Sequence, residues 1–173
     1  MRARHSLVLL LLPLLSSCSY GYELLAVRID GRVAFVVDPS SDYQPDCLRS
    51  IDVSADHGEP KAKPEPGDHE GLVRNGGVYW WDFRDVRSCE NEFPIFYGTR
   101  LKGPPAESIG YVRAKPLIPG VVYSVGSEGD GAYGSGWFKI LPNGAIENYA
   151  SDPTPPVLDE DGYVVRDVGN EQS

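Results

Sequence analysis

The chain has 173 residues, with 16 lysines and arginines against 25 aspartates and glutamates, so its formal net charge is −9. This length accommodates one folded domain. An acidic body repels phosphate backbones and anionic headgroups, which excludes nucleic acid as a partner and electrostatic attachment to membranes.

The first 17 residues have the pattern of an export signal. Arg2 and Arg4 give a basic start, and residues 7–15 form an apolar stretch. Nine residues at about 1.5 Å of helical rise each are too short for a hydrocarbon core about 30 Å thick. The segment therefore predicts a processed signal peptide and not a transmembrane anchor.

This stretch ends in the run Leu-Ser-Ser-Cys at 15–18, which resembles the lipobox of bacterial lipoproteins. The resemblance implies cleavage after residue 17, lipid on Cys18 and a short tether over 18–22. Because Ser19 and not aspartate follows, it also implies an outer-membrane location facing the periplasm in a Gram-negative cell. Ordinary secretion with cleavage nearby is the alternative. The mature chain would carry 14 basic and 25 acidic residues, a charge of −11, so the lipid alone would attach it to the membrane.

The first structural signal is a β-hairpin. Residues 23–29 and 32–37 are apolar, β-branched runs that flank Asp30 and Gly31. Asp-Gly between two such runs is a strong hairpin signal, because glycine adopts positive φ without steric cost. A third strand is expected over 47–53.

Residues 55–71 are rich in proline, glycine and charge, which predicts a long loop. His57 and His69 lie in it beside several carboxylates and are the best metal candidates of the chain. Such a loop gives the histidines no fixed geometry, so no metal or other cofactor is expected.

Cys47 and Cys89 are the thiols left once Cys18 is assigned to lipid. Neither has a second cysteine or histidine at the spacing that zinc sites use. Export places them in an oxidising compartment, so one intramolecular disulfide is predicted.

A strand over 77–83 contains two adjacent tryptophans. Alternation puts Tyr79, Trp81 and Phe83 on one face, and Trp80 on the other with Val78 and Asp82. One indole is expected to fill the core, and a loop or the tail is expected to cover the other, because large aromatic side chains are usually well buried. The alternative is that the outer indole lies exposed as a stacking platform for a sugar or a partner. Trp80 and Trp81 are the candidate binding residues on that alternative.

The remaining chain reads as short strands separated by turns. These strands are expected at 95–101, 109–114, 121–126, 137–141 and 145–149. The glycine-rich segment 126–136 lacks the Gly-Lys-Ser/Thr ending of a phosphate loop and is interpreted as a mobile hairpin loop. Residues 151–173 are acidic and contain prolines, which predicts a mostly disordered tail.

The run Leu-Ile-Pro-Gly-Val-Val-Tyr-Ser-Val at 117–125 resembles the tyrosine corner of fibronectin type III domains. The resemblance implies that the Tyr123 hydroxyl bonds to upstream backbone, that Leu117 is a core anchor and that Val125 points inward. Together with the strand pattern, it predicts an all-β antiparallel sandwich of the fibronectin type III or immunoglobulin-like kind over 23–150. A small β-barrel is the alternative.

Catalytic motifs do not stand out. There is no Gly-x-Ser-x-Gly elbow, and both histidines of the mature chain lie in the proline-rich loop. We therefore expect a non-enzymatic, lipid-anchored cell-envelope protein that binds a protein or glycan through its surface. One alternative is a periplasmic inhibitor or ligand-binding lipoprotein that uses the loop 126–136. Another is an envelope hydrolase with a pair of carboxylates.

Overall fold

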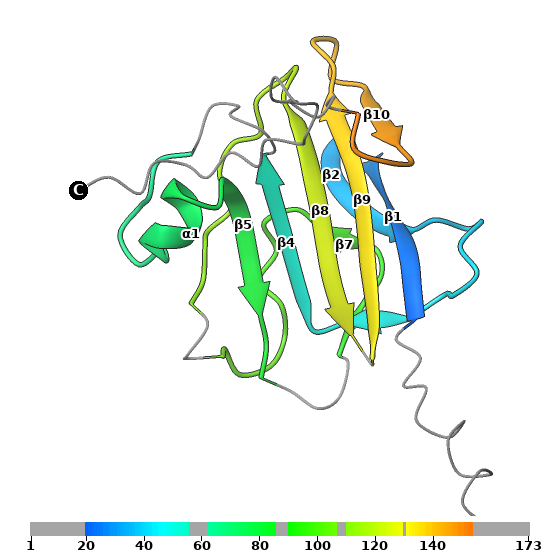
Figure 1. Ribbon diagram of the computed structural model, residues 1–173, viewed down its shortest axis with the longest axis horizontal. Coiled ribbons are helices and arrows are strands. Elements are labelled where there is room, and N and C mark those ends of the chain that lie inside the picture. The colour runs from blue at the N-terminus through cyan, green and yellow to red at the C-terminus, as the bar shows by residue number, and fades with distance from the viewer. Residues whose placement is uncertain (1–19, 56–61, 86–89, 107–109, 130, 154–173) are drawn as a thin grey trace, which may run out of the picture.

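The computed structural model describes residues 20–55, 62–85, 90–106, 110–129 and 131–153, and these form an all-β protein (Figure 1). The elements are β1 (Tyr20–Ile29), β2 (Arg32–Val37), β3 (Cys47–Leu48), β4 (Ser50–Ala55), α1 (Glu70–Arg74), β5 (Val78–Phe83), β6 (Asn91–Glu92), β7 (Ile95–Phe96), β8 (Val122–Gly129), β9 (Ala132–Ile140) and β10 (Ile146–Tyr149). The predicted all-β class is confirmed. Within the described ranges, no helix has the length and apolar character needed to cross a bilayer.

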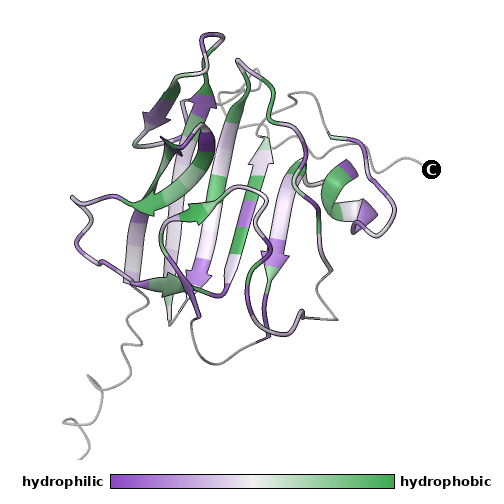
Figure 2. Ribbon diagram, turned by 180° about the vertical axis from the view of Figure 1, so that it is seen from behind, coloured by the Kyte–Doolittle hydropathy of each residue, from purple (hydrophilic) through white to green (hydrophobic). Residues whose placement is uncertain are grey.

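One large sheet dominates the fold. Its strands lie in the order β5-β4-β8-β9-β1-β2-β7, and β10 pairs with β9, while β3 and β6 form a separate small ladder. The sheet curls into a half-barrel, so β2 and β7 lie behind β8 and β9 (Figure 1). Figure 2 shows the same arrangement from behind, with apolar residues along β2. Because the structure has one large curled sheet, it does not confirm the predicted sandwich of two sheets.

Strand β1 changes partner along its length. Its first part, Tyr20 to Glu23, pairs parallel with β9, and Leu24 to Ile29 pair antiparallel with β2. The prediction of a purely antiparallel sheet is therefore wrong at the β1–β9 pair. Glycine permits the close approach, since a methyl group at Gly136 would lie 2.1 Å from the Leu24 carbonyl oxygen.

The interpretation of 126–136 as a mobile hairpin loop is also wrong. Strands β8 and β9 pair continuously from Val122 opposite Lys139 to Gly129 opposite Ala132. The glycines belong to paired strands because β1 and its side chains pack closely against them. A methyl group at Gly134, for example, would lie 2.3 Å from Cε2 of Tyr22.

The hairpin predicted around Asp30 and Gly31 is confirmed. Strands β1 and β2 pair from Leu24 opposite Val37 to Ile29 opposite Arg32. Asp30 and Gly31 both have positive φ, 48° and 77°, as a type I′ turn requires.

The core lies inside the curl and is built around aromatic rings. Phe35 stacks on Trp80 with centroids 6.5 Å apart, and Phe138 lies 5.5 Å from both Phe35 and Tyr123. All four of these rings are fully buried. Fully burying an aromatic or large aliphatic side chain contributes about 1.5–3 kcal/mol, so this cluster is a main source of stability.

A β-bulge changes the predicted alternation of β5. Val53 pairs with Trp80 while Ser54 pairs with Val78, which leaves Tyr79 as the extra residue. Tyr79 and Trp80 both join the core, whereas Trp81 remains only partly buried. Tyr79 therefore does not share a face with Trp81, because the extra residue interrupts the two-residue period.

The tyrosine-corner contact is present. The backbone N–H of Ile118 donates to the Tyr123 hydroxyl at 2.8 Å, and Tyr123 is fully buried. Leu117 packs against the core, and Val125 is 2 % exposed. These three expectations are confirmed.

Some predicted strands are shorter in the structure. The strand expected over 47–53 is divided at Arg49 into β3 and β4, and the one expected over 95–101 is reduced to β7. Around 109–114 there is a single bridge, in which Val112 and Trp81 exchange two backbone hydrogen bonds of 3.0 Å. This bridge covers part of the free edge of β5.

The long polar loop is better anchored than its composition suggests. Within residues 62–69, the fully buried Asp68 carboxylate accepts from Lys115 Nζ at 2.5 Å and from the Arg113 N–H at 3.0 Å. His69 then caps α1, as its Nδ1 accepts from the Leu72 N–H at 3.2 Å. A buried ion pair therefore holds this part of the loop, together with Ala62, which packs against the hydrophobic core.

Candidate functional site

The outer, convex face of the large sheet carries side chains in two cross-strand rows. Successive residues of a strand point to opposite faces, so partners in register share a face. The first row consists of Trp81, Asp52, Gly126, Ser135 and Glu23. The second row consists of Phe83, Ser50, Glu128, Tyr133 and Gly21.

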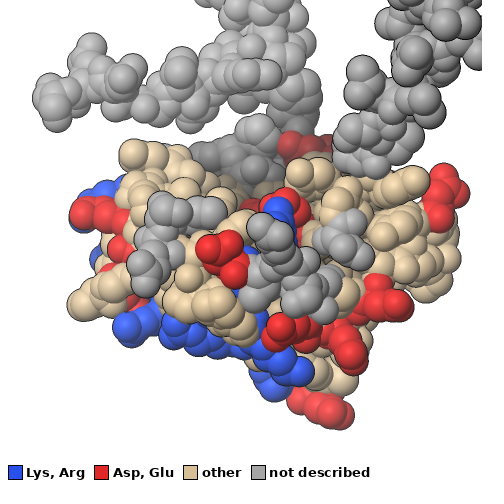
Figure 3. Space-filling model, turned by 90° about the horizontal axis from the view of Figure 1, so that it is seen from below, with Lys and Arg blue, Asp and Glu red and all other residues tan. Residues whose placement is uncertain are grey.

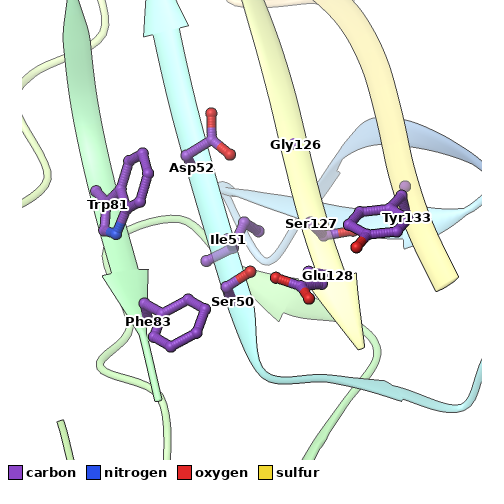
Figure 4. A pocket seen from close by; sticks show the side chains of 10 residues that line it. Ser50, Ile51, Asp52, Trp81, Phe83, Gly126, Ser127, Glu128 and Tyr133 are labelled. Carbon is purple, nitrogen blue, oxygen red and sulfur yellow. The ribbon is translucent and has the colours of Figure 1, made fainter. Parts of the chain in front are cut away.

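A hollow lies in these rows across β5, β4, β8 and β9. Figure 4 shows Trp81 and Phe83 on one side, Tyr133 on the other, and Asp52 and Glu128 between them. Its volume is about 320 Å³, at the lower end of the range of ligand sites. We call this hollow the sheet-face groove.

Gly126 leaves the floor of the groove open. It lies directly opposite Asp52, and a methyl group there would be 2.5 Å from Asp52 Oδ1. The absent side chain makes room for the carboxylate to lie over the strand. Glycine is therefore a steric requirement of this floor.

Asp52 is electrostatically unusual. Burial raises the pKa of its carboxyl group to about 6, because the charged form loses hydration. No hydrogen-bond or ion-pair partner of its side chain is found among the described residues. Within the described residues, Asp52 is therefore an acceptor that lacks a donor.

Glu128 has a partner, in contrast to Asp52. The Arg49 guanidinium forms an ion pair with it and lies over the Phe83 ring, 5.5 Å from the centroid. The backbone reinforces this contact, since the Arg49 N–H donates to the Glu128 carbonyl oxygen at 2.8 Å. The pair fixes the lower end of the groove.

Trp81 forms the wall of the groove on β5, together with Phe83. It packs against the small cluster of Val73, Val78 and Val112 under helix α1. Its indole Nε1 is buried without a hydrogen-bond partner among the described residues. A buried N–H without an acceptor is unusual in a native fold.

A second, more polar hollow adjoins the groove on the other side of Tyr133. Its lining includes Glu23 and Asp42 together with Ser41 and Ser135. Tyr133 borders both hollows and is 56 % exposed. The two hollows therefore form one tract across five strands, with Tyr133 as the ridge between them.

The structure separates the two candidate tryptophans. Trp80 is fully buried in the core, and Trp81 lines the groove. Asp52, Gly126 and Tyr133 are not among the site residues predicted from the sequence. The alternation of β4 is the signal for Asp52, since the apolar neighbours Ile51 and Val53 point inward and place Asp52 on the outer face.

The remaining candidates have other surroundings. Cys47 takes part in a disulfide. Cys89, its predicted partner, lies outside the described residues, as do Cys18 and His57, so that pairing and the lipid site stay predictions. In the part of the chain that the structure describes, no group of three histidine, cysteine or acidic side chains is placed to hold a metal ion.

Comparisons of the chain with models of known protein families, with curated proteins and with solved structures found no match. Function must therefore be argued from the site itself.

Proposed function

We propose that the protein is a lipid-anchored component of the bacterial cell envelope that binds an elongated partner, without catalysis, in the sheet-face groove. The groove itself supports this proposal most. It combines aromatic walls, an unpartnered carboxylate and a floor kept open by Gly126. Aromatic surfaces with a few fixed polar groups are the usual composition of ligand sites.

The width of the groove favours an elongated ligand. Trp81 on β5 and Tyr133 on β9 are three strand spacings apart, or about 14 Å at roughly 4.8 Å per spacing. A single ammonium group must lie within about 6 Å of each ring that holds it. The two walls therefore cannot enclose one small cation, but they can contact successive parts of a chain.

The expected lipid on Cys18 would keep this site close to the membrane. Tyr20, two residues further along, already belongs to β1, and Gly21 and Glu23 of the same strand line the second hollow. The proposed location is the outer membrane, facing the periplasm, if the cell is Gram-negative. There the candidate partners are envelope proteins and glycans.

We also propose that the domain is a divergent sandwich of the fibronectin type III or immunoglobulin-like kind. The Tyr123–Ile118 hydrogen bond supports this proposal, because it joins the same positions as in the tyrosine corner. The curl that brings β2 and β7 over the inner face of β8 and β9 is compatible with it.

Two variants test the anchor and the groove separately. Cys18→Ser should lose incorporation of labelled palmitate, and after detergent phase separation it should be found in the aqueous phase and not with the lipoproteins in the detergent phase. The soluble Cys18→Ser protein should still co-sediment with isolated envelope fragments, because the groove is intact. Adding Tyr133→Ala should abolish that co-sedimentation.

Tyr20→Ala is the matched control for Tyr133→Ala. Both tyrosines are equally exposed, 55 % and 56 %, but Tyr20 stacks on Tyr43 outside the groove, with ring centroids 5.1 Å apart. Equal loss of co-sedimentation in both variants would contradict binding by the groove. Unchanged palmitate incorporation by Cys18→Ser would contradict the anchor.

The carboxylates of the groove favour a second function, glycoside hydrolysis. Asp52 and Glu128 occupy diagonal positions on paired strands, where the Cα atoms are about 7–8 Å apart. A carboxyl group with a raised pKa beside an ionised one is the arrangement of acid and base in glycosidases. If the protein releases reducing sugar from envelope glycans, and Asp52→Asn abolishes this release, hydrolysis is supported over binding alone.

A further inference from the structure

The tract of two hollows is acidic along its whole length. Carboxylates line it at Asp52, Glu128, Glu23 and Asp42, and no lysine or arginine lines either hollow within the described residues. Arg49 beside it pairs with Glu128. Basic side chains are unevenly spread elsewhere, since they gather along one margin of the end seen in Figure 3.

We propose that the occupant of this tract is a positively charged, extended peptide segment of an envelope partner; this inference rests on the groove being the binding surface. The tract crosses five strands, so it is about 19 Å long at roughly 4.8 Å per spacing. An extended peptide covers that length with about six residues. Three positions of the tract are suited to its cationic side chains.

The first position lies between Trp81 and Asp52. An ammonium or guanidinium group there would contact the face of the indole and donate to the Asp52 carboxylate, for which the described part of the chain supplies no donor. The second position is the exposed ring of Tyr133, which separates the two hollows. The third position lies between Glu23 and Asp42, both of them exposed.

Charge excludes several other occupants. Residues 151–173 contain six carboxylates and one arginine, so the chain's own tail would be repelled by the tract. A second copy of the chain carries the same net charge of −9. Anionic headgroups and nucleic acids are excluded for the same reason.

Isothermal titration of the purified full protein with octalysine, octaglutamate and chitohexaose tests this proposal. Octalysine should bind, and its affinity should fall about tenfold between 50 and 300 mM salt because exposed charges are screened. Octaglutamate and chitohexaose should not bind. Glu23→Gln combined with Asp42→Asn should weaken octalysine binding about threefold to tenfold.

Asp30→Asn is the matched control, because it removes one carboxylate in the β1–β2 turn, where asparagine tolerates positive φ. An octalysine affinity that falls equally in the control and in Asp42→Asn would overturn the proposal, since net charge alone would then explain binding. If chitohexaose binds, and Tyr133→Ala abolishes this binding, the proposal of a cationic occupant is also overturned. The groove would then remain the binding surface. If neither octalysine nor chitohexaose binds, the proposal of a cationic occupant is overturned. The co-sedimentation experiment then tests the groove independently.

Discussion

Asp52 lies directly opposite Gly126 on the outer face of the sheet, and its Oδ1 occupies the space that a side chain at 126 would fill. Gly126→Ala should therefore displace the carboxylate and narrow the groove. We expect octalysine affinity to fall about tenfold. The free energy of unfolding should change by less than about 1 kcal/mol, because the Asp52 side chain can rotate. Isothermal titration and urea unfolding measure the two effects, and an unchanged affinity would show that the floor of the groove takes no part in binding.

The raised pKa of Asp52 predicts a pH-dependent stability. The folded state favours the protonated form of Asp52 more than the unfolded state does. Its contribution to the free energy of unfolding is therefore complete below about pH 4 and is lost as the pH rises through about 6. Asp52→Asn removes this loss. The variant should gain about 1–3 kcal/mol relative to wild type between pH 4 and pH 8. Urea unfolding at intervals of one pH unit measures the difference.

Glu128 is the other carboxylate that lines the groove, and its ion pair with Arg49 beside the groove sets the control for this experiment. Because Glu128 is ion-paired, Glu128→Gln should not reproduce the gain at pH 8. A constant difference between wild type and Asp52→Asn across the pH range would mean that Asp52 titrates normally.

Gly136 is a site where a small substitution should be severe. A methyl group there would lie 2.1 Å from the Leu24 carbonyl oxygen, which is backbone and cannot move without separating β1 from β9. Gly136→Ala should cost more than about 3 kcal/mol of unfolding free energy, as expected of overpacking in a rigid interior. Gly21→Ala is the control, since nothing lies within 4 Å of the added methyl group. Similar midpoints of urea unfolding for both variants would contradict the close β1–β9 contact.

The hydrogen bond of the tyrosine corner should contribute measurably to stability. Tyr123→Phe leaves the Ile118 N–H without its partner and should cost about 1–2 kcal/mol. Tyr133→Phe removes an exposed hydroxyl for which no partner is found among the described residues, and should cost nothing measurable. Thermal unfolding of both variants makes the comparison. Equal midpoints would mean that the corner does not stabilise the fold.

The elements that the sequence predicts well are those with local signals. The hairpin at Asp30–Gly31 depends on positive φ at two neighbouring residues, and the corner at Tyr123 depends on a contact five residues upstream. Both are encoded within a few positions. Their prediction needed no knowledge of the distant chain.

The elements that the sequence does not predict depend on distant contacts. The glycines of β8 and β9 resemble a loop by composition, yet their role is to admit Asp52, Tyr22 and Leu24, which come from other strands. The bulge at Tyr79 arises from its pairing with β4 and reverses the expected orientation. The groove was missed for the same reason, because Asp52, Glu128 and Tyr133 become neighbours only through the strand order.

The sheet-face groove as the binding surface is tested most directly by NMR of the isotopically labelled protein during titration with octalysine and, separately, chitohexaose. For the probe that binds, backbone shift changes should concentrate at Asp52, Gly126, Tyr133 and Glu23, which share the tract. They should be absent from the β1–β2 turn at Asp30 and Gly31. Shift changes centred on that turn or on the β2–β7 side of the sheet, with none at Gly126, would contradict the groove as the site of binding.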